Sequence, residues 1–385
     1  MSEPVLGSTA DLELPADVAY LYTAAEGPPL KAHAAALRAY LAARGLGEPG
    51  RDRHLAVEQE CRVLVARLLG SEAASIAFMA NASEALASVA EAIAWEDGDN
   101  VVISDLEFPS NVLPWLRLKQ RGVEVRVVAG EGWRLDPAAL AAAVDGRTRA
   151  ISVSHVSYLS GARLELAPLR AAADDHGALL IVDATQSAGV VPVPAGIADV
   201  VVASSYKWLL GAHGLGIVAV DRARTAALEP PLVGWRAVAD MFSPHRFERF
   251  AWRPDARRWE LAFPSYPALY MLRDSLRWLL ALEIERIEAH VLALGDRLIA
   301  GLERQGRTVM TPREQAARAG SVAFVAADGA ALSAALARAG VLGWGGDGRM
   351  RFSLHAFNAA ADVERALDAL AAVDPDGDGA PEAGR

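Results

Sequence analysis

The sequence LLIVDATQSAG at residues 179–189 decides the fold of this chain. Its first residues are typical of a buried strand, and Asp183 marks the carboxyl end of that strand. The sequence VVVASSYKW at residues 200–208 begins with a second run of this kind. Its apolar residues are followed by hydroxyl side chains and by Lys207. Ligands of open α/β sheets usually bind at the carboxyl ends of the strands. We therefore expect Asp183 and Lys207 to lie on neighbouring strands at one edge of a sheet.

Apolar runs alternate with helical segments on both sides of these stretches, from about residue 55 to residue 220. This alternation predicts a layered α/β domain with a largely parallel sheet that helices cover on both faces. The expected strands are residues 101–103, 123–128, 150–153, 179–182, 200–203 and 216–220, and the expected helices between them are residues 84–95, 109–120, 137–144 and 166–176.

The pattern changes beyond about residue 265, where long helices are expected at residues 266–282 and 285–302. The strands expected at 321–325 and 349–354, with helices at 329–339 and 361–371, predict a small C-terminal α+β domain. We expect a large domain over residues 20–265, a small domain formed by residues 1–19 and 266–373, and a flexible tail over residues 374–385.

Composition restricts the kind of partner. A net charge of -10 opposes a nucleic-acid surface, which needs clustered Lys and Arg, so a small molecule is the expected ligand. The chain has neither a basic segment followed by an apolar run at its start nor an apolar stretch of about 18 residues, so we expect a cytoplasmic protein without a membrane partner. The single cysteine, Cys61, excludes an internal disulfide and a multi-cysteine metal site, and its helical context predicts a core thiol.

The two strand ends carry parts of a site for pyridoxal 5′-phosphate (PLP), which needs a lysine, an acidic partner for the pyridine nitrogen and a cradle for the phosphate. Asp183 could keep the ring nitrogen protonated, and Gln186 could hydrogen-bond the phenolic oxygen. Lys207 must lose a proton before it forms a Schiff base, and partial burial lowers the pKa of a lysine. The alternative for Asp183 is that it only caps the next helix.

Hydroxyl groups and a helix start could hold the phosphate. Ser204 and Tyr206 lie beside Lys207 and could donate to it. The segment NASEAL at residues 81–86 reads as a turn entering a helix, where the backbone N–H groups of Ala82 and Ser83 and the Ser83 hydroxyl would bind an anion. The alternative is that Ser83 is only the N-cap of that helix.

Taken together, these residues resemble the class V aminotransferase family, PLP enzymes of fold type I that include cysteine desulfurases, selenocysteine lyases, kynureninases and isopenicillin-N epimerase-like proteins. The resemblance runs from Tyr20 to about Leu370 and is most specific at residues 182–189 and 204–208. It implies a mainly parallel seven-stranded sheet and a homodimer with active sites at the subunit interface. It also implies that Lys207 forms the Schiff base, that Asp183 pairs with the pyridine nitrogen, and that Ser83, Ser204 and Tyr206 bind the phosphate.

Further positions match the family's site. Phe108 falls where the family stacks an aromatic ring or a histidine on the cofactor, although it could instead be a core side chain. Arg351 matches the arginine that binds the substrate α-carboxylate through two parallel hydrogen bonds, and a surface arginine is the alternative. Tyr158 replaces a frequent asparagine and could hydrogen-bond the cofactor or act as an acid. Ala262-Phe263 replaces a Gly-Thr pair that contacts the neighbouring subunit's phosphate, a contact that Ser265 could take over.

The sequence departs from cysteine desulfurases at their nucleophile. Those enzymes carry a persulfide-forming cysteine on a loop just before the arginine, whereas the corresponding residues 341–348, VLGWGGDG, contain none. Phe108 also replaces the desulfurase histidine. Our leading hypothesis is a homodimeric PLP lyase that eliminates a β-substituent, such as a sulfur group, from an amino acid. An aminotransferase or epimerase of the same family remains an alternative, as does a non-catalytic PLP-binding relative.

Overall fold

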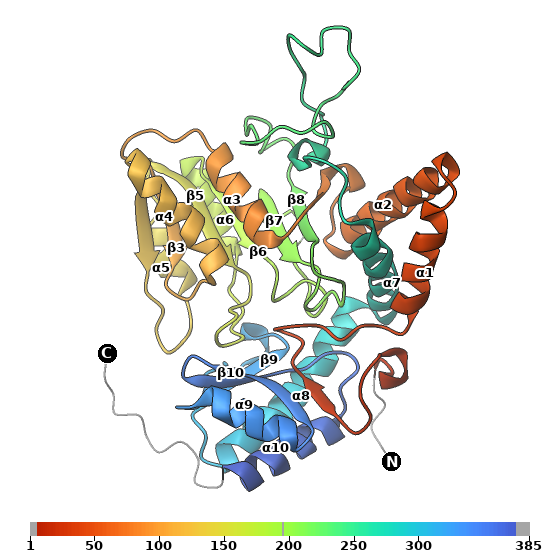
Figure 1. The fold of residues 1–385 in the computed structure, drawn as a ribbon. Coiled ribbons are helices and arrows are strands. Elements are labelled where there is room, and N and C mark those ends of the chain that lie inside the picture. The colour runs from red at the N-terminus through yellow and green to blue at the C-terminus, as the bar shows by residue number, and fades with distance from the viewer. Residues whose placement is uncertain (1–5, 195, 375–385) are drawn as a thin grey trace.

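Seven strands form the central sheet of the structure, a computed structural model that describes residues 6–194 and 196–374 (Figure 1). The strands are β2 (Ile76–Met79), β3 (Asn100–Ser104), β4 (Glu124–Val128), β5 (Thr148–Ser154), β6 (Leu179–Asp183), β7 (Val200–Ser204) and β8 (Gly216–Val220). They pair in the order β2-β8-β7-β6-β5-β3-β4. Only the β2–β8 and β7–β8 pairs are antiparallel, so the expected mainly parallel seven-stranded sheet is confirmed.

Helices cover both faces of this sheet because successive strand residues point to opposite sides. α3 (Ala82–Ala92) and α4 (Leu113–Leu118) pack on the face that carries Val101 and Ile103. α5 (Pro137–Ala142) and α6 (Ala167–His176) pack on the face that carries Val102. The helix expected over residues 109–120 is shorter than predicted, since 3₁₀ turns at Pro109–Asn111 and Lys119–Arg121 flank α4. Proline interrupts it, because Pro109 and Pro114 have no N–H to donate within a continuous helix.

Three more helices, α1 (Ala32–Arg44), α2 (Glu48–Leu68) and α7 (Tyr266–Leu282), pack together beside the β2 end of the sheet (Figure 1). Residue 265, the expected domain boundary, directly precedes α7. The next helix, α8 (Ile284–Arg304), runs into the smaller unit. The division of the chain at residue 265 stays a prediction.

A second sheet forms the core of the smaller unit. Its strands are β1 (Ala19–Leu21), β9 (Ser321–Val325), β10 (Val341–Gly346) and β11 (Arg349–Ser353), in the order β1-β10-β11-β9. Together with α8, α9 (Gly329–Arg338) and α10 (Ala360–Val373) they form the expected small α+β unit, which β1 joins from the N-terminal part of the chain.

The strand β10 was not predicted, because glycine is unfavourable in strands and three of its six residues are glycine. It pairs with β11 through a two-residue turn at Asp347 and Gly348, whose φ angles of 52° and 70° are both positive. An Asp-Gly pair favours this hairpin turn, and it is the signal in the sequence that could have identified the strand.

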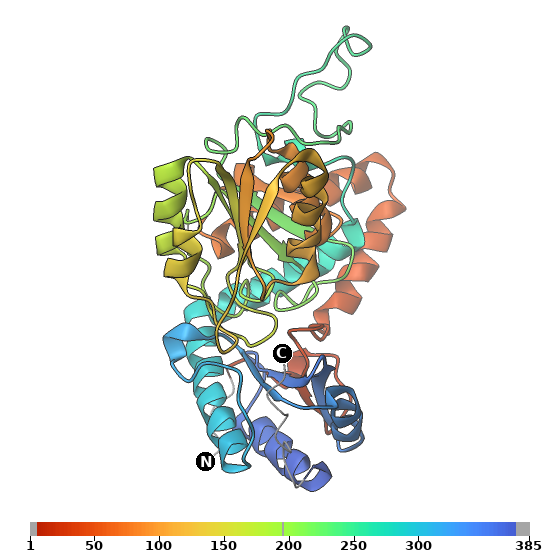
Figure 2. The same cartoon turned by 90° about the vertical axis from the view of Figure 1, so that its left-hand side faces the viewer.

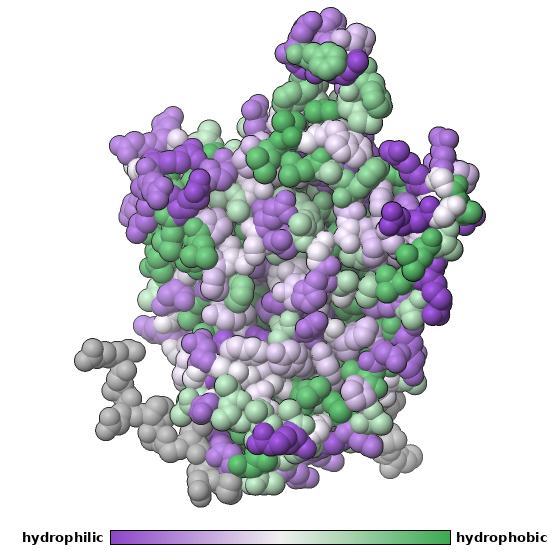
Figure 3. Space-filling view, viewed as in Figure 1, coloured by the Kyte–Doolittle hydropathy of each residue, from purple (hydrophilic) through white to green (hydrophobic). Residues whose placement is uncertain are grey.

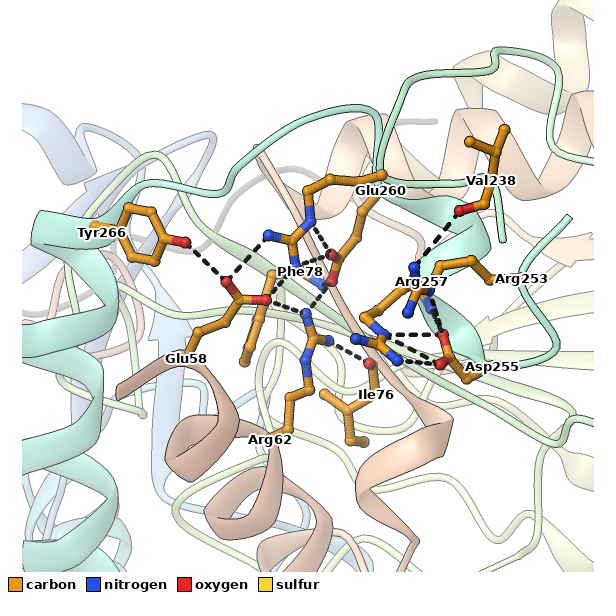
Figure 4. Close-up of polar contacts among 11 residues, drawn as sticks. Glu58, Arg62, Ile76, Phe78, Val238, Arg253, Asp255, Arg257, Glu260 and Tyr266 are labelled. Carbon is orange, nitrogen blue, oxygen red and sulfur yellow. Dashed lines mark hydrogen bonds and ion pairs between the residues drawn. The ribbon is translucent and has the colours of Figure 1, made fainter. Parts of the chain in front are cut away.

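Four buried charges tie α2 to the connection that precedes α7 (Figure 4). Arg62 lies 2.6 Å from both Glu58 and Glu260, and Arg236 lies 2.9 Å from Glu260 and also pairs with Glu58. The Tyr266 hydroxyl, at the start of α7, donates to Glu58 at 3.1 Å. Arg62 and Glu260 also hydrogen-bond the backbone of β2. This network of Glu58, Arg62, Arg236 and Glu260, which we call the buried tetrad, fixes α2, α7 and β2 relative to one another.

The chain between β8 and α7 projects from the end of the molecule opposite the smaller unit (Figures 1 and 2). Residues 238–252, which we call the projecting arm, are pinned at their base by the pairing of Val238 with Trp252. Phe242 and Phe247 on the arm are 75% and 87% exposed. The space-filling view shows apolar surface on this projection beside polar residues (Figure 3).

Two expectations concern the chain's extremities and the membrane. The expected flexible tail, residues 374–385, lies outside the described residues except for Asp374. Within residues 6–194 and 196–374, no helix combines the length and the apolar character that crossing a bilayer requires.

Candidate active site

A cavity lies at the carboxyl ends of β6 and β7, where the two sequence motifs meet. Asp183 is the last residue of β6, and Lys207 follows β7 by three residues. Nine of the residues predicted for the site line this cavity: Ala82, Ser83, Phe108, Tyr158, Asp183, Gln186, Ser204, Tyr206 and Lys207. Five others line it that the sequence did not single out: Asn81, Ser110, Ser154, Val156 and Thr185.

Asp183 is buried at the base of the cavity. The backbone N–H of Thr185 donates to its Oδ1 at 2.8 Å. Burial raises the pKa of Asp183, and the hydrogen bonds from Thr185 and the charge of Lys207 oppose this rise. No cationic side chain among the described residues pairs with it within ion-pair distance, and a buried carboxylate needs such a partner. A protonated pyridine nitrogen has the required charge and donor, so Asp183 fits PLP.

Lys207 has the properties of an amine that can react near neutral pH. Burial lowers its pKa to about 8; Asp183 opposes this shift, and Arg351 adds to it. Its Nζ lies 5.5 Å from the centre of the Phe108 ring and 5.7 Å from that of Tyr206. Among the described residues no carboxylate holds the ammonium in an ion pair, so the amine is available to an electrophile in the cavity.

The start of α3 supplies the anion-binding end of the cavity. Asn81 caps this helix, since its side chain accepts a hydrogen bond from Glu84 N at 2.8 Å. The alternative that Ser83 is the N-cap is therefore wrong. The Ser83 hydroxyl instead lies 2.6 Å from the Ser110 hydroxyl, and both line the cavity. Two hydroxyls beside the free N–H groups of a helix start suit a phosphate.

Gln186 and Thr185 hold the two strand ends together. The Gln186 amide donates to Ala24 O at 3.0 Å and accepts from Trp208 Nε1 at 2.8 Å. Its second amide hydrogen is left for the predicted contact with the phenolic oxygen. Thr185 Oγ1 accepts from the backbone N–H of Ser204 at 3.1 Å, which joins the end of β7 to the segment after β6.

Tyr206 is supported by side chains that the sequence did not indicate. Its ring stacks on His213 with the centroids 4.0 Å apart, and His213 Nε2 lies 3.1 Å from Glu26. Glu26 comes from the N-terminal part of the chain, so only the fold brings the three together.

Phe108 and Tyr158 form one wall of the cavity. Their rings meet edge to face with the centroids 5.1 Å apart. Phe108 is 42% exposed, so the alternative of a core phenylalanine is wrong. The Tyr158 carbonyl accepts a hydrogen bond from Arg351 Nη1. This contact brings the smaller unit against the cavity wall.

Arg351 does not line the cavity directly, but it is buried behind Tyr158 rather than lying on the surface. Burial, together with the charge of Arg349, lowers its pKa to about 9. Ser265 lies elsewhere, in a neighbouring hollow shared with Met79 and Phe263. Its contact with the phosphate of another subunit stays a prediction.

Cys61 is a core thiol, as predicted. It is buried in α2, and its Sγ donates to Leu269 O at 3.2 Å. Burial raises its pKa to about 12, so it stays protonated and unreactive at neutral pH.

The fold and the cavity define a PLP-dependent enzyme of fold type I. The chain belongs to the Aminotransferase class-V family, whose sequence profile matches residues 20–366.

Several known proteins are similar to the chain. A probable cysteine desulfurase of Methanothermobacter thermautotrophicus is 34% identical over 245 residues, which cover 63% of this chain and 60% of that protein. The match thus spans less than two thirds of that relative's length. The apo structure of a cysteine desulfurase from Thermococcus onnurineus NA1 superposes with a TM-score of 0.86 at 25% identity, covering 94% of this chain and 96% of the other. The cystine C-S lyase C-DES, in complex with cysteine persulfide, shares the fold at a TM-score of 0.84 and 20% identity, covering 92% of this chain and 98% of the other.

Proposed function

We propose that the chain is a lyase that eliminates a β-substituent, with C–S bonds as the leading candidates, from an amino acid. The observation that carries the proposal is that Lys207 and Asp183 line one cavity, with Arg351 buried behind its Tyr158 wall, while the described residues offer no reactive thiol there. Cys61 is buried and protonated, and residues 341–346 form β10 instead of a loop that could carry a nucleophile. A persulfide mechanism like that of the desulfurase relatives therefore has no nucleophile among the described residues.

Residues in and beside the cavity would have separate roles in such a reaction. Bound PLP supplies an electron sink for the negative charge that develops at the substrate Cα. Arg351 binds the α-carboxylate and orients Cα toward Lys207. Lys207 Nζ takes the Cα proton, and a pKa near 8 suits a base that works close to neutral pH. The β-substituent leaves with its bonding electron pair. Hydrolysis of the unsaturated amino acid that remains gives pyruvate and ammonia.

Phe108, Tyr158 and Asp183 control the surroundings of that step. Burial raises the pKa of Asp183, and a cationic ring nitrogen opposite it would favour its charged carboxylate form. Phe108 and Tyr158 form an aromatic wall of the cavity and would exclude water from the reacting carbon on that side.

We also propose that the protein is a cytoplasmic homodimer. The projecting arm supports the dimer, because Phe242 and Phe247 expose large apolar side chains there, and exposed apolar surface often marks a contact with a partner. Ser265 would then reach the phosphate of the partner's site in place of the threonine that this chain lacks.

The test is an absorbance spectrum of the PLP-loaded protein during titration with cysteine conjugates, kynurenine and alanine, followed by product analysis. Pyruvate and ammonia are the expected products. A keto acid with pyridoxamine phosphate would instead indicate aminotransfer, and loss of optical activity would indicate epimerisation. A spectrum that responds to no amino acid would favour a non-catalytic PLP-binding protein.

A further inference from the structure

A second buried arginine lies beside Arg351 on the same face of β11. Arg349 and Arg351 are two residues apart, so their side chains leave the strand on one side, while Met350 and Phe352 face the core. The arginines are 2% and 4% exposed. Trp344, on β10, lies against both: its ring centre is 4.7 Å from the Arg349 guanidinium carbon and 5.4 Å from that of Arg351.

The described part of the protein supplies one carboxylate for the two guanidinium groups. Asp347 is the carboxylate that pairs with Arg349, at 2.6 Å, and no described carboxylate pairs with Arg351, whose Nη1 is held by the carbonyl of Tyr158. Both Nε atoms are buried and have no hydrogen-bond partner among the described residues. The cluster thus has an excess positive charge and unused donors in a region shielded from water, which favours binding of an anion.

The position of Asp347 allows a ligand to displace it from Arg349. It lies at the tip of the β10–β11 hairpin, between Gly346 and Gly348, and its side chain is 71% exposed. Its φ of 52° is in the left-handed region, which aspartate tolerates better than most residues. An exposed carboxylate at a hairpin tip is a weak competitor for a buried arginine compared with a ligand that binds two arginines at once.

The cluster also borders the proposed active site. The Arg349 guanidinium carbon lies 5.2 Å from the centre of the Tyr158 ring, and that ring lines the cofactor cavity and contacts Phe108. Alternate residues of a strand are about 7 Å apart. Two arginine side chains at that spacing can bind the two acid groups of one short molecule.

We propose that Arg349 and Trp344 form a second anion subsite, so that the substrate is an amino acid whose departing β-substituent carries its own carboxylate, beyond the bond that breaks. The proposal rests on the proposed function, in which Arg351 takes the α-carboxylate. Arg349 is then the residue that selects for the acidic side chain, and Asp347 occupies it when substrate is absent.

The test compares ligands of equal shape and different charge. The PLP-loaded protein is titrated with L-aspartate, L-asparagine and L-alanine, and binding is followed by cofactor absorbance and calorimetry. We expect aspartate to bind at least about tenfold more tightly than asparagine, since one charge-assisted hydrogen-bonded pair is of this strength or more. Arg349→Met should remove the preference and leave the affinity for alanine unchanged. Asp347→Asn should increase the preference, because it removes the competing carboxylate.

A second measurement does not depend on the cofactor chemistry. Calorimetric titration of the cofactor-free protein should show tighter binding of succinate than of butyrate, and Asp347→Asn should widen the difference even if Arg349→Met fails to fold. Equal affinities for aspartate and asparagine, or for succinate and butyrate, would overturn the subsite. A protein that binds succinate over butyrate but whose spectrum responds to no amino acid would instead contradict the proposed function and leave the subsite standing.

Discussion

Lys207 is the residue on which the proposed chemistry depends, and its environment explains why. Its pKa is lowered to about 8 mainly by burial, so a useful fraction of the amine is neutral near pH 7.5. Lys207→Ala should reduce kcat/KM by at least about a thousandfold, the scale of removing a general base. Borohydride reduction of the PLP-loaded protein followed by peptide mapping should label Lys207. The control is Lys119→Ala, a lysine of the 3₁₀ turn after α4, which should retain full activity; labelling of any residue other than Lys207 would contradict the assignment.

Residues at strand ends could be predicted from the sequence, and residues that depend on through-space contacts could not. Asp183 and Lys207 follow apolar runs directly, so their positions on the sheet edge were evident. The N-cap of α3 was ambiguous because Asn81 and Ser83 are both good caps, and only the bond from Glu84 N to Asn81 decides it. His213 and Glu26 were missed because they are 187 residues apart.

Among the elements, the hairpin β10–β11 and the connection before α7 were the hardest to predict. The glycines of β10 prevented its prediction as a strand, although the Asp347-Gly348 pair indicated the turn that follows it. The partners of the buried tetrad lie too far apart in sequence to be matched: Glu58 and Arg236 are separated by 178 residues. Only the pair formed by Glu58 and Arg62, four residues apart on α2, has a helical spacing that a sequence could reveal.

The buried tetrad gives a prediction about stability. Glu260→Gln leaves the buried guanidinium groups of Arg62 and Arg236 with one carboxylate, so the free energy of unfolding should fall by about 3 kcal/mol or more. Urea denaturation would measure the change. The matched control is Glu72→Gln, which breaks an exposed pair with Arg222 and should cost less than about 1 kcal/mol. Equal losses for the two variants would mean that the tetrad does not stabilise the fold in this way.

On the scale of the whole molecule, buried histidines should make stability depend on pH. His33, His155 and His355 are buried, and desolvation lowers their pKa values to about 4, 3 and 4. Between these values and 6.5 the unfolded chain binds more protons than the folded one, so stability falls as pH falls through that window. Each histidine should cost roughly 2 kcal/mol at pH 5 relative to pH 7.5. Urea titrations at the two pH values would measure this, and His33→Gln should reduce the loss whereas His176→Gln, at an exposed site on α6, should not.

The general architecture was predictable because it follows from local patterns, whereas the proposed association of subunits depends on surface that no pattern defines. Alternating strands and helices indicated the layered sheet and its mainly parallel order. The projecting arm has no regular structure from which a prediction could begin, and only the fold shows that its segment stands out from the molecule (Figure 2) with its phenylalanines exposed.

The projecting arm also allows a test of the proposed dimer. If Phe242 and Phe247 are covered by a second copy, light scattering after size exclusion should give twice the chain mass of 40.7 kDa. The double variant Phe242→Ser, Phe247→Ser should shift the mass toward a single chain, because it removes two aromatic contacts of the size that dominates interfaces. Val127→Ser, at an exposed position of the edge strand β4, should leave the mass unchanged. Because Ser265 is proposed to complete the partner's phosphate site, the double variant should also bind PLP more weakly; a wild-type protein that elutes as a monomer with full PLP affinity would contradict both the dimer and the shared site.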